Sequence, residues 1–235
     1  MIFAIAMGRG EGGEGAAPTP DAGAGVRRGL WPRLFAWTLA QGDAVQHRTY
    51  DARKRRLFSR IEGRGGPPVV VEIGAGTGLN AATLPADCRW IAVEPNVHFH
   101  DRIRAAAKRH GCNADVRAGL AEDLPVADGA ADAVVSTLVL CSVADVRQAL
   151  AEARRVLRPG GRFLFVEHVA APSGTLLRRS QRLLRRPWAV VADGCRLDQD
   201  TGRLVREAGF ASVETEAFQV PGGLVAPHVM GVATA

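Results

Sequence analysis

The residues with the clearest chemical potential form a glycine-rich segment, Glu72-Ile73-Gly74-Ala75-Gly76-Thr77-Gly78, which follows a short apolar run. Glycine lets the backbone turn sharply and brings a ligand against main-chain atoms. Glu94, twenty residues after Gly74, ends the next apolar run, where a carboxylate can accept hydrogen bonds from both ribose hydroxyls of an adenosine cofactor. A glycine loop alone is weak support because many turns need glycine. The loop and the acidic residue at this spacing together predict an adenosine-containing cofactor.

The order of the glycines separates two kinds of cofactor. The dinucleotide fingerprint is GxGxxG, whereas this chain has GxGxG, with Leu79 at the position of the third glycine. Glu72, immediately before the loop, is unsuited to a pyrophosphate and suits a cofactor that carries an ammonium group. S-adenosylmethionine (SAM) has an ammonium group and no phosphate, so the loop favours SAM over NAD.

Two further residues are candidates for catalysis. His168 follows an apolar run that we expect to be the fifth strand, at the end where open α/β sheets place their ligands, and a histidine there suits a general base. The alternative is a structural histidine bonded to a loop carbonyl. Tyr50, the only tyrosine, is expected over the cofactor in an N-terminal lid, or else in the core. For His228 and Asp193 a packing or capping role is the stronger expectation.

The elements that must position these residues alternate between β-branched runs and helical patterns. Strands are predicted at residues 69–73, 90–94, 115–117, 132–136 and 162–167, and helices at 96–110, 144–157 and 198–208. Two closing strands at 212–218 and 225–234 are close enough to pair antiparallel. Repeated β-α-β alternation implies a doubly wound, mostly parallel sheet, which is a Rossmann-like α/β fold with a C-terminal antiparallel hairpin.

The chain divides into three segments. Residues 1–25 are Gly, Ala, Pro and acidic residues after a short apolar start, and they predict a disordered leader. Residues 26–66 predict a helical lid segment, and residues 67–235 the catalytic domain. With 235 residues, 47% of them hydrophobic, one core is expected. No run of apolar residues is long enough to predict a membrane-spanning helix.

Charge and cysteine usage limit the partners. The formal charge of +6 comes mostly from arginine and fits a nucleic-acid or anionic-membrane partner, or a plain bias in composition. Segments 27–39 and 176–188 are amphipathic and basic, which predicts interfacial helices or an ordinary lid with a charged outer face. Cys88, Cys112, Cys141 and Cys195 have no CxxC spacing, so we expect no metal site, no disulfide framework and a reducing cytoplasmic compartment.

The segment from Val69 to Gly161 resembles the class I SAM-dependent methyltransferases. Residues 71–78 match the first motif of that family, residues 119–125 resemble the segment that lines the adenine, and residues 157–161 match the turn before the fifth strand. Leu120 departs from the pattern, because the family usually has Asp there, and this leaves the adenine contact to Glu122 or to the backbone of Ala121. The resemblance implies these cofactor-binding residues: Glu72, Gly74, Ala75, Gly76, Gly78, Glu94, Pro95, Ala121, Glu122, Thr137 and Leu138.

Several further sequence segments resemble one family within this class. Residues 94–96, 137–143, 165–171, 193–195 and 227–231 are similar to those of the thiol S-methyltransferases, whose animal members methylate small alkyl thiols. The similarity runs from about Tyr50 to the C-terminus. It implies methyl transfer from SAM to a small lipophilic acceptor, with a thiol as the best candidate. The sequence departs from the animal enzymes in its N-terminal part. Those enzymes have a hydrophobic anchor there, whereas this chain has a Gly-rich leader and a basic segment that contains Trp.

Three alternatives remain open at this point. In the first, the acceptor is a phospholipid head group or a quinone precursor. Such an enzyme has the same cofactor-binding half and a different acceptor pocket. Nucleic-acid methylation is disfavoured, because residues 136–140 form an apolar wall where base-modifying enzymes often carry Asn/Asp-Pro-Pro-Tyr, and clustered aromatics for stacking are lacking. A SAM-binding module without catalysis is the third, since cofactor binding does not prove turnover. The oligomeric state is not predicted.

Overall fold

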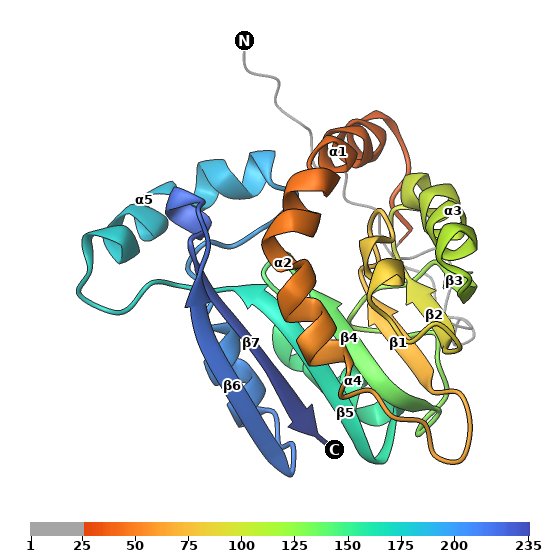
Figure 1. Ribbon diagram of the computed structural model, residues 1–235. Helices are drawn as coiled ribbons and strands as arrows, with labels where there is room; N and C mark the ends of the chain where they lie inside the picture. The colour runs from red at the N-terminus through yellow and green to blue at the C-terminus, as the bar shows by residue number, and fades with distance from the viewer. Residues whose placement is uncertain (1–25) are drawn as a thin grey trace, which may run out of the picture.

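The computed structural model describes residues 26–235, and the predicted leader at 1–25 lies outside the described residues. The described chain forms one seven-stranded sheet in the order β3-β2-β1-β4-β5-β7-β6 (Figure 1). The strands are β1 (Val69–Ile73), β2 (Arg89–Val93), β3 (Asn113–Arg117), β4 (Ala131–Thr137), β5 (Leu157–His168), β6 (Ser212–Gln219) and β7 (Pro227–Thr234). Strands β1 to β5 pair in parallel and β7 pairs antiparallel with both β5 and β6. The predicted Rossmann-like fold with an antiparallel C-terminal pair is confirmed.

Helices cover both faces of this sheet. They are α1 (Leu30–Gln41), α2 (Asp43–Phe58), α3 (His100–His110), α4 (Val146–Val156), α5 (Leu176–Val191) and α6 (Thr201–Glu207), with short 3₁₀ turns η1 (Leu79–Ala82), η2 (Val97–Phe99) and η3 (Gly223–Val225). One core packs α2, η1 and α3 on one face, and a second core packs α4 and α6 on the other. Figure 1 shows α2 in front of the sheet and α4 behind it. Because both faces are covered, the central strands are continuous apolar runs.

The strand register brings the candidate residues together. Ile73 pairs with Val93 on one side and with Ser136 on the other, and Ser136 pairs with Phe165. The ends of β2, β1 and β4 and the last residues of β5 therefore lie at one edge of the sheet. The glycine loop, Glu94, Leu138 and His168 meet there.

The glycine loop leads into the 3₁₀ turn η1. Two local predictions differ from the structure. Strand β5 starts at Leu157, so the predicted turn at 159–161 lies within the strand's bounds. The backbone of residues 157–161 has pairing partners on both sides. Leu157 pairs with Ala131 of β4, and the Gly160 N–H donates to the Ala235 carbonyl at 2.9 Å. Helix α4 starts at Val146, because the Asp145 side chain caps it. None of the described helices has the length and apolar character needed to cross a bilayer.

Candidate active site

A cavity of about 780 Å³ lies at the carboxyl ends of the parallel strands, where α/β sheets of this type bind ligands. Its walls come from the glycine loop, the ends of β2, β4 and β5, the helices α1 and α2, and the segment from α5 to Cys195. The cavity is lined by all but one of the residues predicted from the sequence: His168, Tyr50, Glu72, Gly74, Ala75, Gly76, Glu94, Pro95, Ala121, Glu122, Thr137 and Leu138. The exception is Gly78.

The glycines of the loop serve different purposes. Gly78 has φ +81°, and a Cβ there would lie 2.9 Å from the Cβ of Ala106 and 3.1 Å from the Cα of Ile103. It therefore lets the loop pack against α3 and does not line the cavity, while its role in cofactor binding stays a prediction. Gly74, at φ +63°, is confined by Val139, whose Cγ2 would lie 2.7 Å from an added Cβ. A Cβ on Gly76 would meet nothing closer than 4.0 Å.

Glu94 holds the loop and faces the cavity. Its Oε2 accepts from the Gly76 N–H at 2.9 Å and its Oε1 from the Asn96 N–H at 2.9 Å. Burial raises the pKa of Glu94 to about 6, against the effect of these two hydrogen bonds. Each carboxylate oxygen has two lone pairs, so both oxygens keep an acceptor position. This is the capacity that a ribose diol requires.

Next to the loop lies a buried triplet of Glu72, Asn80 and Lys54. The Asn80 amide donates to Glu72 Oε1 at 2.7 Å and accepts from the Lys54 ammonium at 2.9 Å. Glu72 Oε2 is buried and has no hydrogen-bond partner among the described residues. Burial raises the pKa of Glu72 to about 8 and lowers the pKa of Lys54. The cavity wall thus carries an acidic and a basic group side by side.

Sequence reasoning found Glu72 and missed its two neighbours. Lys54 belongs to the basic run at 53–56, which is typical of a solvated helix face, yet its side chain is 3% exposed. Asn80 lies in η1, immediately after the loop. Asn80 could have been found, because a polar residue directly after a glycine loop is placed to face a ligand. The burial of Lys54 could not, because it depends on how α2 crosses the sheet.

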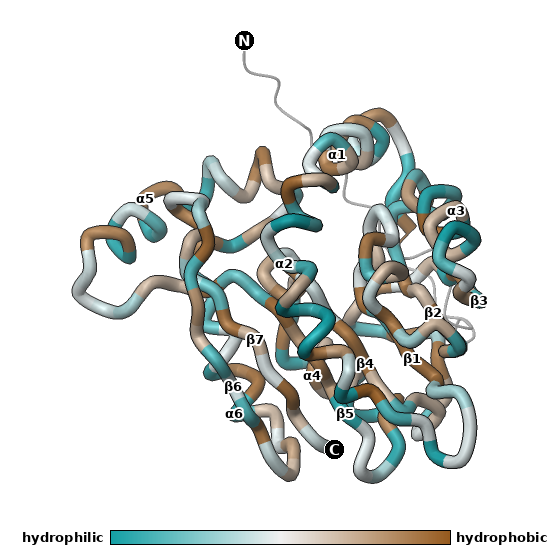
Figure 2. Tube along the Cα trace, in the orientation of Figure 1, coloured by the Kyte–Doolittle hydropathy of each residue, from teal (hydrophilic) through white to brown (hydrophobic). Residues whose placement is uncertain are grey.

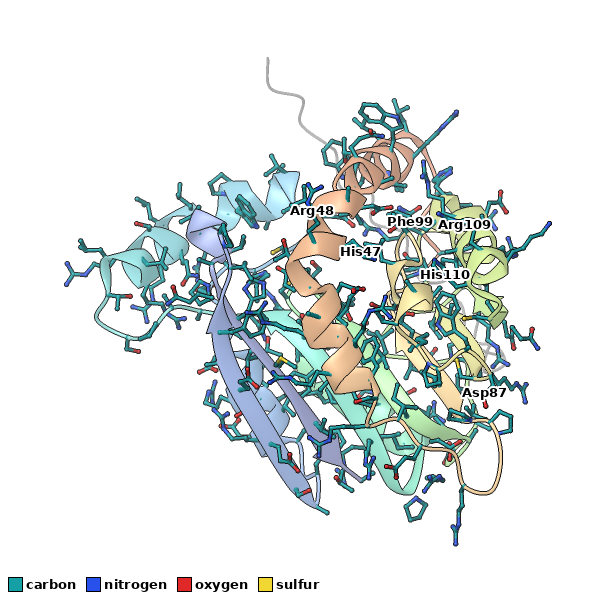
Figure 3. The ribbon with its side chains drawn as sticks, viewed as in Figure 1. His47, Arg48, Asp87, Phe99, Arg109 and His110 are labelled. Atoms are coloured by element: carbon teal, nitrogen blue, oxygen red, sulfur yellow. The ribbon has the colours of Figure 1, made fainter. Side chains whose placement is uncertain are left out.

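The opposite wall carries the segment predicted to face an adenine. Ala121 is buried and lines the cavity. Glu122 also lines it, but its Oε1 accepts from the N–H groups of Ala144 and Asp145 at 2.9 and 3.1 Å and so holds the start of α4. Phe99 closes this side between α1 and α3, where Phe35 of α1 meets it edge-on with ring centroids 6.5 Å apart (Figure 3). Of the two adenine contacts that the sequence left open, this geometry favours the Ala121 backbone.

His168 lies at the other end of the cavity, against two cysteines. Its Nε2 is 2.9 Å from Cys195 Sγ, and its Nδ1 is buried without a hydrogen-bond partner in the part of the chain that the structure describes. Ligand atoms of His168, Cys195 and Cys141 all lie within 4.8 Å of one another. The Trp188 indole N–H donates to Cys195 Sγ at 3.3 Å. Hydrogen bonds from Cys141, His168 and Trp188 lower the pKa of Cys195.

The cysteine spacing in the sequence gave no indication of this cluster. Cys141 follows β4, His168 ends β5, and Cys195 lies beyond α5, so only the fold brings them together. One signal was present, because Cys141 and His168 lie at the carboxyl ends of neighbouring parallel strands.

Sequence reasoning also missed Glu167, beside His168. It is fully buried, its Oε1 accepts from the Ser136 hydroxyl at 2.7 Å, and burial raises its pKa to about 7.

Tyr50 and His228 form a buried pair that also lines the cavity. The Tyr50 hydroxyl lies 2.8 Å from His228 Nε2, and His228 Nδ1 lies 3.0 Å from the Ala226 carbonyl. A carbonyl only accepts, so Nδ1 carries the proton and Nε2 accepts from the tyrosine. Burial raises the pKa of Tyr50 to about 12 and lowers the pKa of His228. His228, expected to pack or cap, is therefore part of the cavity wall.

The mouth of the cavity is bridged by an ion pair. Arg27, ahead of α1, binds Asp193, which lies between α5 and Cys195, through both of its terminal nitrogens. The Arg27 N–H also donates to the Pro95 carbonyl at 2.7 Å. Asp193 has φ +52°, a backbone conformation that favours glycine. The segment before α1 and the segment after α5 are thereby fastened over the cavity.

Comparison with known proteins agrees with this site. Residues 71–165 match the family model described as a methyltransferase domain. The chain is 37% identical over 217 residues to thiol S-methyltransferase TMT1B of Homo sapiens and 35% identical to TMT1A of the same species, in both cases over 87% of this chain and 89% of the relative. A ubiquinone/menaquinone biosynthesis C-methyltransferase, UbiE of Rubrivivax gelatinosus, is 32% identical over 57% of this chain and 54% of its own length.

The fold has solved counterparts. A SAM-dependent methyltransferase from Thermotoga maritima, described as a possible histamine N-methyltransferase, superposes with a TM-score of 0.63 and 22% identity over 87% of this chain and 99% of its own. At this identity the likeness concerns the fold alone. The two chains therefore share the architecture of the sheet and its covering helices.

Proposed function

Because this chain belongs to the thiol S-methyltransferase family of SAM-dependent methyltransferases, we propose that it transfers a methyl group from SAM to the sulfur of a small lipophilic thiol. The observation that carries the proposal is the extent of the similarity, which covers 87% of the chain. It therefore includes the segments on the acceptor side of the cavity as well as the cofactor motifs. The similarity to UbiE covers 57% of the chain, so a quinone-type acceptor has less support.

The residues present fit SAM independently of the family. The Glu72 carboxyl lines the cavity and is an acceptor for the ammonium group of the cofactor, and Lys54, joined to it through Asn80, is a donor for the carboxylate. A zwitterionic amino acid would thus meet opposite charges on one wall. Glu94 takes the ribose hydroxyls, and the Ala121 side of the cavity takes the adenine. SAM supplies an electrophilic methyl group on a sulfonium.

The protein's contribution to transfer is alignment and exclusion of water, which can lower a barrier by ~7–11 kcal/mol. The acceptor sulfur forms a bond to the methyl carbon, the carbon–sulfonium bond breaks, and its electron pair stays on the departing sulfur. The acceptor proton must leave. We place its removal at His168, where Cys195 fixes the ring through Nε2. Tyr50 and Leu138 line the cavity between the two ends, and Leu138 is held at φ +59° in this position.

The test is release of S-adenosylhomocysteine by the purified protein with SAM and a small alkyl thiol. A blank without thiol and a Glu94→Ala variant accompany it, and Glu214→Ala, which removes an exposed carboxylate on β6, is the matched control. We expect thiol-dependent release that Glu94→Ala reduces and Glu214→Ala leaves unchanged. Tight SAM binding without turnover on any alkyl thiol would contradict the thiol proposal and direct the search to head-group or quinol acceptors.

The surroundings of the cavity mouth support a lipid surface as the source of the acceptor. Figure 2 shows brown stretches on α1 and α5. The exposed large hydrophobic side chains of these two helices are Leu30, Trp31, Leu34, Trp37, Leu176, Leu183, Leu184, Val190 and Val191. Five arginines of α5 lie among them. Helices of this composition lie in the membrane interface. The four cysteines are unpaired, which supports a reducing compartment such as the cytoplasm.

This placement has its own measurement. Sedimentation with vesicles of neutral or anionic lipids is expected to show binding that increases with anionic lipid. Replacing Leu34 and Trp37 with Ala, two exposed residues of α1 outside the cavity lining, should weaken it without changing turnover of a water-soluble thiol. Equal binding by the wild-type protein and the double variant would contradict membrane docking through α1.

A further inference from the structure

The cluster at the acceptor end of the cavity has the composition of a metal site. Cys141, His168 and Cys195 are all buried, and they come from three separate segments: the turn after β4, the end of β5 and the loop after α5. Their ligand atoms lie within 4.8 Å of one another. Two cysteine sulfurs and one imidazole nitrogen are a donor set that Zn²⁺ prefers among the common divalent cations.

The distances need little adjustment to accept a cation. A tetrahedral zinc ion with Zn–N of about 2.0–2.1 Å and Zn–S of about 2.3 Å keeps its ligand atoms roughly 3.5–3.8 Å apart. His168 Nε2 and Cys195 Sγ lie 2.9 Å apart and must therefore separate by about 0.6 Å. Cys195, which would have to move, lies in a loop after Asp193 and Gly194, both at positive φ.

Donors and one acceptor surround the sulfurs of the cluster. The Cys141 thiol donates to the Leu138 carbonyl at 3.8 Å, and a bound cation would take the place of that proton. The indole N–H of Trp188 is a donor only, and it points at Cys195 Sγ from 3.3 Å. The Ser142 hydroxyl lies 3.7 Å from Cys141 Sγ. The imidazole of His168 is 5% exposed, and apart from Cys195 it has no hydrogen-bond partner among residues 26–235. A purely structural histidine would be expected to bond a loop carbonyl, and this one does not.

One side of the cluster remains open. All three residues line the cavity, so three protein ligands would leave a fourth position facing the acceptor. Three ligands with one open position is the arrangement of catalytic zinc sites, whereas structural sites are closed by four. The composition, the surroundings and the open side point to the same kind of site.

We propose that Cys141, His168 and Cys195 bind a thiophilic divalent cation, Zn²⁺, and that its fourth position takes the acceptor thiol. The second half rests on the proposed function. In the metal-loaded protein His168 Nε2 is a ligand and no longer the base that accepts the acceptor proton. On binding, the two cysteines and the acceptor each release a proton to water, because a coordinated thiol is deprotonated. Two thiolates neutralise the cation, so the bound acceptor thiolate adds a single negative charge, opposite to the sulfonium. Its sulfur then bonds the methyl carbon as the carbon–sulfonium bond breaks, and the neutral thioether, a weaker ligand, dissociates.

Cobalt substitution tests the site without reference to activity. Reduced, metal-free protein is titrated with Co²⁺ in the absence of oxygen, and near-ultraviolet thiolate-to-cobalt absorption together with red d–d bands reports a tetrahedral site with sulfur ligands. We expect saturation at one ion per chain and loss of the bands on addition of Zn²⁺. Cys141→Ser, Cys195→Ser and His168→Gln should each weaken or abolish the spectrum. Cys88→Ser and Cys112→Ser are the matched controls and should retain it.

The outcomes separate the site from the proposed function. Absence of the bands in folded wild-type protein, or their persistence in folded Cys195→Ser, would overturn the metal site. So would formation of a Cys141–Cys195 disulfide in air by a protein that binds no Co²⁺ when reduced. Circular dichroism shows whether each variant is folded. A shift of the cobalt bands on addition of an alkyl thiol supports the open fourth position. One bound ion with neither a shift nor thiol turnover would overturn the thiol acceptor and leave the metal site standing.

Discussion

The hydroxyl of Tyr50 and the Nε2 of His228 lie 2.8 Å apart, which joins α2 to the last strand of the sheet across 178 residues of sequence. Both side chains are buried and both line the cavity. The tyrosine donates, because His228 Nδ1 is engaged with the Ala226 carbonyl. The N-terminal helical segment is thus fixed to the C-terminal strand at the wall of the site.

Removing the Tyr50 hydroxyl tests the energetic weight of this pair. Tyr50→Phe should lower the free energy of unfolding by about 1 kcal/mol, and more if His228 Nε2 stays unpaired. A double-mutant cycle with His228→Leu, measured by urea unfolding, should show coupling between the two residues. Strictly additive effects would mean that the hydrogen bond contributes nothing to stability.

The Lys54–Asn80–Glu72 triplet predicts a selective loss of cofactor affinity. Lys54→Met and Glu72→Gln should weaken S-adenosylhomocysteine binding by about tenfold or more, since each removes a charge-assisted hydrogen bond. Methylthioadenosine has no amino acid group, so its affinity should change little. Calorimetric titration of both ligands measures the difference. Equal losses for the two ligands would contradict the assigned roles and indicate damage to the whole cavity.

The raised pKa of Glu72 makes SAM binding depend on pH. With a pKa of about 8 the free protein holds a proton on Glu72 near neutrality, and binding of the ammonium group expels it. Affinity should therefore increase with pH, by up to about tenfold per unit. Above about pH 8 it should fall again, because an α-amino group loses its own proton near pH 7.7–8.0.

The Glu72→Gln variant is the control for this pH effect. Between about pH 6.5 and 7.5, below the amino pKa, its affinity should be nearly constant. Titrations in buffers of different ionisation enthalpy should also show proton release by the wild-type protein and none by the variant. A wild-type affinity that does not change over this range would contradict the assignment.

The ion pair between Arg27 and Asp193 predicts an effect on ligand release. Arg27→Ala should speed dissociation of S-adenosylhomocysteine several-fold, because the pair fastens the cavity mouth, although partial exposure keeps its energy within about 1 kcal/mol. Arg28→Ala, an exposed neighbour of the same charge, should have no effect. Stopped-flow displacement measures the rate. If the charge-swapped double variant, Arg27→Asp with Asp193→Arg, restores the slow dissociation, the effect of Arg27→Ala is due to the ion pair.

Two loop glycines should respond differently to the same substitution. Gly78→Ala combines a positive φ with a clash against α3, so it should lower the melting temperature more than Gly76→Ala, where a Cβ meets nothing closer than 4.0 Å. Gly76 lines the cavity and Gly78 does not, so Gly76→Ala should cause the larger loss of SAM affinity among folded variants. A larger loss of SAM affinity in Gly78→Ala than in Gly76→Ala would support a direct role of Gly78 in cofactor binding.

The sequence alone determined the features that depend on local chemistry. Short β-branched runs ending in Gly74 or Glu94 predicted the parallel strands and the cofactor half of the site, because strand ends, glycine turns and N-caps are encoded within a few residues. Parallel strands end on one edge, so residues that follow such runs were predicted together correctly. Gly78 shows the limit, since its motif position indicated a ligand contact and gave no sign of its close packing against α3.

Only the tertiary structure decided which distant side chains meet. Cys141 and Cys195 approach His168 because β4 and β5 are neighbours and the loop after α5 returns over them. Lys54 is buried because α2 crosses the sheet face next to Asn80, and His228 enters the cavity because β7 inserts beside β5. Such contacts depend on the path of whole elements, and spacing along the chain does not record them. Residue types therefore predicted the cofactor, and the fold brought together the groups at the other end of the cavity.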